Sequence, residues 1–284
     1  MSAVDASGTL TLGGDIEVHR LAYGAMRITG QGVWGPPPDR DTAKDVLRRV
    51  VGLGIDLIDT ADSYGPHVSE QLIAEALHPY PDDLTIATKG GLEHTGPGQW
   101  PRNGRPEHLR AACEGSLKRL QVERIDLYQL HSPDAAVPYS ESVGALKELQ
   151  DEGKIRHVGV SNVSLEQLDE ARSIIDVVTV QNRFNLTDRT SQDVLDVCER
   201  DGLGFFAWFP LAAGNLAEPG GLVAEIAQAH DATPGQVALA WLLQRSPVML
   251  PIPGTGSIAH LEENVAAAEL ELNEEELAQL EDAA

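Results

Sequence analysis

The stretch GIDLIDTADSYGPH, residues 54–67, joins a short apolar run to a group of polar side chains. The apolar half is typical of a buried β-strand, and Asp59, Asp62 and Tyr64 follow at its end. In α/β proteins the carboxyl ends of parallel strands are where ligands bind, so two carboxylates and a phenol at this position indicate a functional edge. Which α/β fold contains that edge depends on how many similar strands the chain carries.

Eight segments of the chain have the pattern of parallel strands. Each is short, rich in β-branched or aromatic residues and apolar on both faces, as a strand covered on both sides must be. The predicted strands are residues 20–26, 56–62, 84–90, 124–131, 156–162, 177–184, 204–210 and 248–254.

The segments between these strands have the pattern of amphipathic helices. In residues 41–53, 106–120 and 190–202 apolar side chains recur at spacings of three and four. A glycine separates helix from strand in VGLGIDLID, DEGKIRHVGV and RDGLGFFAW, and glycine readily adopts the left-handed conformation that ends a helix. The chain therefore alternates strand and helix.

Eight βα units within 284 residues predict an α/β protein of the (β/α)8 TIM-barrel class, preceded by a β-hairpin in residues 7–18. We expect residues 1–284 to form one domain. The alternative is a doubly wound open sheet, which normally carries a GxGxxG loop after its first strand; AYGAMRITG at residues 22–30 does not match it. Two long loops, residues 34–39 and 91–106, follow the first and third strands and belong to the mouth of a barrel.

Composition excludes several classes of function. With 21 basic and 44 acidic residues the net charge is −23, which disfavours binding to nucleic acid or to an anionic membrane. The two cysteines, Cys113 and Cys198, make no disulfide framework, and we find no signal peptide or membrane-spanning run, so a cytoplasmic location is expected. No HxH, HExxH or CxxC pattern predicts a metal site, and GxSxG and P-loop patterns are absent from the sequence.

Polar residues stand at the ends of several other predicted strands. Lys89 follows the third strand and His131 the fourth, while the fifth and sixth end in polar groups that include Gln181 and Asn182. Each alone has an ordinary explanation, such as a helix cap or a satisfied core histidine. In a closed barrel, however, these ends meet on one rim. A lysine buried there costs several kcal/mol unless a carboxylate pairs with it, and Asp59 is the expected partner.

Four motifs in this order resemble the aldo-keto reductases, which are NAD(P)H-dependent (β/α)8-barrel oxidoreductases. They are IDTADSYG (58–65), IATKGG (86–91), DLYQLHSP (126–133) and IPGTGSIAHLEENVAA (252–267), and the resemblance runs from about Arg20 to Leu280. The details GPPPDRDTA, YGPHVSE, PYPDDLTIATK and QVALAWLLQRSP are similar to a bacterial branch described as pyridoxal-reductase-like.

The resemblance implies a catalytic tetrad of Asp59, Tyr64, Lys89 and His131. In it, hydride from the nicotinamide reaches the carbonyl carbon while Tyr64 protonates the oxygen. Lys89, held by Asp59, is expected to lower the pKa of the phenol from about 10, and His131 to donate a hydrogen bond to the carbonyl oxygen. Asp62 falls outside the tetrad and is interpreted as a supporting loop residue.

The resemblance also implies cofactor contacts. Trp208 stands where the family usually has a tyrosine stacked on the nicotinamide, although a tryptophan of the barrel core is the alternative reading. Gly254 and His260 replace a lysine and an arginine of many members, so we expect NADP(H) on family grounds and leave NAD(H) possible. The implied cofactor residues are Met26, Arg27, Asp59, Ser161, Asn162, Gln181, Trp208, Leu211, Gly214, Asn215, Gly254, Thr255, His260, Glu263 and Asn264.

The predicted substrate is a small carbonyl compound held by the mouth loops. The expected pocket residues are Trp34, Tyr64, Trp100, His131 and Phe184. Their aromatic character suits a planar aldehyde such as pyridoxal. Two other functions stay open, namely a lyase that forms a Schiff base at Lys89 and a nucleotide-sensing subunit without catalysis. No long apolar surface stripe calls for a partner, and we expect a monomer.

Overall fold

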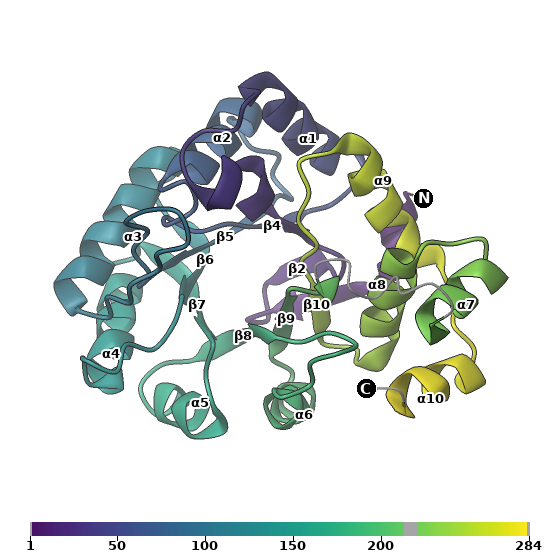
Figure 1. Ribbon diagram of the computed structural model, residues 1–284. Helices are drawn as coiled ribbons and strands as arrows, with labels where there is room; N and C mark the ends of the chain where they lie inside the picture. The colour runs from purple at the N-terminus through teal and green to yellow at the C-terminus, as the bar shows by residue number, and fades with distance from the viewer. Residues whose placement is uncertain (1, 213–220, 283–284) are drawn as a thin grey trace.

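A computed structural model describes residues 2–212 and 221–282, and its centre is a barrel of parallel strands. The strands pair in the order β10-β9-β8-β7-β6-β5-β4-β3, and helices surround them (Figure 1). Their bounds are β3 (Tyr23–Gly24), β4 (Leu57–Asp59), β5 (Thr85–Gly90), β6 (Ile125–Leu130), β7 (Ile155–Ser161), β8 (Val177–Arg183), β9 (Gly204–Trp208) and β10 (Met249–Pro251).

Two backbone hydrogen bonds join the first and last strands of the barrel. The N–H of Ala22 donates to the carbonyl of Pro251 over 3.1 Å, and the N–H of Gly24 donates to that of Pro253 over 3.2 Å. A Cβ at Gly24 would stand 2.6 Å from the carbonyl oxygen of Ile252, so the seam requires a glycine at this position. The predicted (β/α)8 barrel is therefore confirmed.

The helices connect successive strands and cover the outside of the barrel (Figure 1). Gly202 ends α6 with a φ of 71°, as the sequence predicts, and Thr233 caps α8 through a capping box. The α-helices are α1 (Arg40–Gly52), α2 (Val68–Leu77), α3 (Pro106–Leu120), α4 (Tyr139–Asp151), α5 (Leu165–Arg172), α6 (Gln192–Asp201), α7 (Leu222–Ala229), α8 (Pro234–Arg245), α9 (Ile258–Ala266) and α10 (Glu274–Asp282). Short 3-10 helices are η1 (Ala3–Ser7), η2 (Ala25–Ile28), η3 (Gln31–Val33) and η5 (Ala267–Glu269).

The N-terminal hairpin closes one end of the barrel. It consists of β1 (Thr9–Leu12) and β2 (Ile16–His19), as the sequence predicts. Its buried side chains form one apolar cluster with inward-facing residues of the strands; the main members are Leu12, Ile16, Val18, Leu57, Ala87, Leu127, Phe206 and Leu250. This end of the barrel is thus filled with apolar side chains, and Asp59 and Lys89 stand two residues further along β4 and β5.

No helix in the described ranges is long and apolar enough to cross a membrane. That residues 1–284 form a single domain stays a prediction.

Candidate active site

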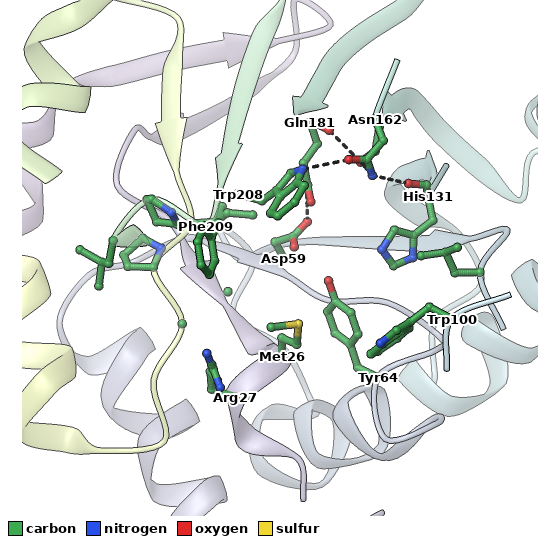
Figure 2. Close-up of a pocket in the computed structure, with 18 residues that line it drawn as sticks. Met26, Arg27, Asp59, Tyr64, Trp100, His131, Asn162, Gln181, Trp208 and Phe209 are labelled. Atoms are coloured by element: carbon green, nitrogen blue, oxygen red, sulfur yellow. Dashed lines mark hydrogen bonds between the residues drawn. The ribbon is translucent and has the colours of Figure 1, made fainter. Parts of the chain in front are cut away.

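A cavity of about 560 Å³ opens at the carboxyl ends of the strands. Its walls come from segments that are far apart in the sequence, and their side chains turn toward one another (Figure 2). The lining residues are Gly24, Met26, Arg27, Asp59, Tyr64, Leu92, Trp100, His131, Ser161, Asn162, Gln181, Trp208, Phe209, Pro210, Leu211, Ile252, Pro253 and Gly254.

A buried ion pair lies at the base of this cavity. The Lys89 ammonium donates to Asp59 Oδ2 over 2.6 Å and to the carbonyl of Thr60 over 2.8 Å. Register explains the contact: Asp59 pairs with Ala87, and Lys89 stands two residues further along β5, so both side chains point into the barrel. Lys89 is 0% exposed and Asp59 is 2% exposed, so neither charge is stabilised by water.

The other oxygen of Asp59 is held by two amides. Asp59 Oδ1 accepts hydrogen bonds from Gln181 on β8, at 2.8 Å, and from Gln129 on β6, at 3.2 Å. Burial lowers the pKa of Lys89, but Asp59 and Tyr64 outweigh that effect and the net pKa is raised. Both oxygens of the Asp59 carboxylate therefore accept hydrogen bonds, and Lys89 stays charged at neutral pH.

Tyr64 lies beside this ion pair on the loop after β4. The ammonium nitrogen of Lys89 is 5.2 Å from the centre of its ring, and the phenol projects into the cavity (Figure 2). Burial raises the pKa of the phenol above 10, and Lys89 opposes this rise without cancelling it. The expectation of a net lowered pKa is therefore wrong. At neutral pH the phenol keeps its proton and can donate it.

His131 faces Tyr64 across the same end of the cavity. The ring centroids are 5.9 Å apart, and the planes meet at 79°. Burial and, to a lesser extent, the charge of Lys89 hold the pKa of the imidazole well below 6.5. Its buried Nδ1 has no hydrogen-bond partner among the described residues, so a proton placed there would have no acceptor. We therefore assign the proton to Nε2 of a neutral ring.

The ends of β7, β8 and β9 are tied together on the opposite wall. Ser161 Oγ donates to the carbonyl of Gln181 over 2.7 Å, and Asn162 donates to the carbonyl of His131 over 2.9 Å. The indole of Trp208 in turn donates to Asn162 Oδ1 over 3.1 Å (Figure 2). These bonds fix an aromatic ring and several amides along one side of the cavity.

Arg27 is the cationic group that lines the cavity. None of the ion pairs between described residues includes it. Gly254 is next to its stem: a Cβ at that position would stand 3.5 Å from Arg27 Cγ and 2.7 Å from the carbonyl oxygen of Gly24. The close approach to the Gly24 backbone therefore requires a glycine at position 254, and the guanidinium of Arg27 can attract an anion.

Four predicted cofactor residues lie on the β10–α9 connection and on α9, outside the cavity lining. The side chain of Ser257 caps α9. Thr255 is buried and accepts a hydrogen bond from the N–H of Ser257, and His260 is exposed in the first turn of α9. Glu263 accepts a hydrogen bond from the capping residue Thr233 over 2.7 Å, while Asn264 is buried. Two other predicted residues, Gly214 and Asn215, lie outside the described residues.

The structure separates two predicted substrate residues from the cavity. Phe184 is completely buried and packs against Phe205 and Trp241, with ring centroids 5.8 and 6.0 Å away. It stands three residues after the inward-facing Gln181, so alternation directs it to the outer face of the barrel. Trp34 also does not line the cavity, and its side chain contacts the imidazole of His94 instead.

Sequence reasoning missed other residues of the site. Phe209 and Ile252 line the cavity, and Gln129 binds Asp59. The position of Phe209 directly after Trp208 was the available signal for one of them. The remaining two depend on how the loops and strands face each other in space.

Asp62 does not line the cavity, and its role as a supporting loop residue stays a prediction. It is 4% exposed, and its Oδ1 has no partner among the described residues. Burial and the neighbouring Glu70 raise the pKa of this carboxyl well above 3.8. The lysine at the base of the cavity is therefore paired with Asp59 alone.

A closed parallel barrel with this ion pair, phenol and imidazole at its open end defines an oxidoreductase of the carbonyl-reducing kind. The family model of the aldo/keto reductases matches residues 20–284, and the chain belongs to that family.

The chain is similar to proteins from several organisms. It is 49% identical over 283 residues to an uncharacterized oxidoreductase of Schizosaccharomyces pombe, covering 99% of this chain and 92% of that one. It is 44% identical over 282 residues to pyridoxine 4-dehydrogenase of Escherichia coli, covering 97% and 98%.

Solved structures agree with this assignment. Glycerol dehydrogenase from Gluconobacter oxydans superposes with a TM-score of 0.87 at 30% identity, covering 98% of this chain and 95% of that one. An aldo/keto reductase from Klebsiella pneumoniae, solved in complex with NADP and acetate, gives a TM-score of 0.83 at 31% identity, covering 97% and 94%.

The electrostatics of His131 lead to a prediction about pH. Because its pKa is held well below 6.5, the ring stays neutral as pH falls from about 8 to about 6, and becomes charged only below that range. NMR titration of the histidine ring nitrogens measures this, with the spectrum of His131→Gln identifying the signal. A protonation midpoint near 6.5 for His131 would contradict the assignment.

Proposed function

We propose that the protein reduces aldehydes or ketones to alcohols with NADPH, and that Tyr64 is the proton donor. The observation that carries this proposal is the meeting of Tyr64, His131 and the Lys89–Asp59 ion pair at one cavity. Each of these groups has a charge or protonation state that suits carbonyl reduction.

Each side chain of the site has a separate role in the reduction of the carbonyl group. A bound nicotinamide would supply the hydride for the carbonyl carbon. The neutral imidazole of His131 donates a hydrogen bond to the carbonyl oxygen, which stabilises the negative charge that develops there. Tyr64 transfers its phenolic proton to that oxygen, and the Lys89 ammonium stabilises the phenolate that is left. Asp59 keeps the ammonium charged and in place.

The residues of the cavity fit a nicotinamide nucleotide. Ser161, Asn162 and Gln181 offer amide and hydroxyl groups at one end, and the Trp208 indole provides a flat surface for a ring. At the other end, Arg27 places an unpaired guanidinium where the nucleotide phosphates would lie. In an otherwise strongly acidic chain, a cation at this position supports an anionic cofactor. The Klebsiella pneumoniae reductase with NADP is a further argument for the same choice.

Aromatic aldehydes, pyridoxal among them, are the substrates that we propose. Trp100 and Leu92 give the substrate end of the cavity aromatic and apolar walls. The similarity to the Escherichia coli pyridoxine 4-dehydrogenase supports a pyridoxal-like compound. A cytoplasmic location and a monomeric state stay predictions from the sequence.

A Schiff-base lyase fits this site less well. Lys89 is 0% exposed, does not line the cavity and is held by Asp59 over 2.6 Å. A charged, enclosed amine is a poor nucleophile for a carbonyl group, so we favour the reductase. A nucleotide-sensing subunit would keep the cofactor contacts and show no turnover, which the next experiment also tests.

Replacement of the proton donor tests the proposed function. Tyr64→Phe should lower kcat for benzaldehyde or pyridoxal by at least about a hundredfold, since it removes general acid catalysis worth roughly that factor. NADPH affinity, measured by quenching of tryptophan fluorescence, should change by less than about threefold, because the phenol is assigned to the substrate side. A variant that keeps most of the wild-type rate would rule out the proton-donor role. A wild-type protein that binds NADPH but reduces no aldehyde would rule out the reductase.

The nucleotide preference can be tested at the start of α9. His260 is exposed there, and a permanently charged guanidinium would bind a 2′-phosphate more firmly than an imidazole. His260→Arg should therefore lower KM for NADPH relative to NADH by about three- to tenfold. His260→Gln is the matched neutral control and should leave the ratio close to that of the wild type. An unchanged ratio in the arginine variant would mean that the 2′-phosphate binds elsewhere.

A further inference from the structure

Residues 91–103, which follow β5 and which we call the arm, form a small hairpin over the substrate end of the cavity. The N–H of Glu93 donates to the carbonyl of Pro101 over 2.9 Å, and that of Thr95 donates to the carbonyl of Gln99 over 3.3 Å. The sequence analysis treats this segment as a loop, and the hairpin was not predicted.

A tight turn closes the hairpin at its tip. The N–H of Gln99 donates to the carbonyl of Gly96 over 2.9 Å, with Pro97 and Gly98 between them. Gly98 has a φ of 71°, and proline followed by a left-handed glycine is the composition of a type II turn. The dipeptide therefore sets the register of the arm.

That register places His94 opposite Trp100. Residues 93 and 101 and residues 95 and 99 are linked by backbone hydrogen bonds, so positions 94 and 100 form a non-hydrogen-bonded pair. Side chains of such a pair lie on the same face and close together. The imidazole and the indole are accordingly stacked, with centroids 3.8 Å apart and planes 23° from parallel.

Two further contacts fix His94 itself. Its Nδ1 is 3.2 Å from the carbonyl of Ser63, the residue before Tyr64, and because a carbonyl only accepts, Nδ1 is the donor. Its ring also meets Trp34 edge-on at 5.1 Å. His94 is 6% exposed, so it is enclosed between the arm and two other mouth loops.

Trp100 connects this packing to the reaction. Its indole lines the cavity and meets the Tyr64 ring edge-on, with centroids 6.4 Å apart. A carbonyl group that reaches the Tyr64 phenol must therefore place the rest of its molecule near Trp100. The orientation of this indole decides what shape of molecule fits there.

We propose that His94 is a positioning residue that holds Trp100 as a fixed aromatic wall, and that it thereby favours carbonyl compounds with a planar ring next to the carbonyl group. This inference rests on the proposed reductase function. A wall that is already ordered costs no side-chain entropy when an aromatic substrate binds, whereas a mobile indole would have to be ordered first. An aliphatic aldehyde gains little from the wall and so is little affected by its loss.

Two variants separate the contacts that His94 makes. His94→Phe keeps a ring that can stack on Trp100 but loses the hydrogen bond to Ser63, while His94→Asn keeps a donor and loses the ring. The measured quantity is the ratio of kcat/KM for benzaldehyde to that for propanal, both with NADPH. In His94→Asn this ratio should fall by roughly three- to tenfold, the range expected for an aromatic contact, with kcat/KM for propanal unchanged. In His94→Phe the ratio should stay within about twofold of the wild type.

A double-mutant cycle shows whether His94 acts through Trp100. In the background of Trp100→Leu, His94→Asn should alter the ratio by less than about twofold, because the wall is already gone. Circular dichroism and NADPH affinity report whether each variant is folded. Activity on propanal does not require the aromatic wall, so the ratio can be measured in every variant of the cycle.

The outcomes separate this inference from the proposed function. An unchanged ratio in His94→Asn, an equal loss in His94→Phe, or a full effect of His94→Asn in the Trp100→Leu background would each overturn the positioning role. If the wild type binds NADPH yet reduces neither benzaldehyde nor propanal, the reductase function itself is wrong.

Discussion

The buried ion pair between Lys89 and Asp59 is the interaction on which the rest of the site depends. Two charges with almost no exposure are costly unless each is fully partnered, and here the lysine has a carboxylate and a carbonyl while the carboxylate also has two amides. The pair explains why a cation can stay beside Tyr64 in an apolar barrel. Burial, and to a lesser extent the charge of Lys89, keeps His131 neutral.

The barrel makes this pair possible by dividing its interior into two parts. The N-terminal hairpin and the first residues of the strands fill one end with apolar side chains, and the polar residues follow two positions later on the same inward face. Because the strands are parallel and close on themselves through Ala22 and Gly24, their carboxyl ends meet at one cavity. The ion pair therefore lies on strands, and Tyr64 and His131 lie on the loops that follow them.

The sequence predicts those parts that depend on periodicity and on strand ends. The eight strands follow from short apolar runs, and the tetrad positions are implied by the resemblance to the aldo-keto reductases. Phe184 was misplaced because it stands three residues after the inward-facing Gln181, and alternation along β8 puts it on the outer face of the barrel. His94 was missed because a turn that was not predicted brings it opposite its partner, Trp100. The raised pKa of Tyr64 depends on burial, which the sequence does not contain.

A crystal structure with NADP⁺ bound tests the central claim most directly. We predict that the nicotinamide occupies the cavity between Trp208 and the Tyr64–His131 pair, that Lys89 stays bonded to Asp59, and that the phenol of Tyr64 faces the cavity beside the ammonium. Nucleotide bound elsewhere, or in place while the phenol points away from Lys89, would contradict the account.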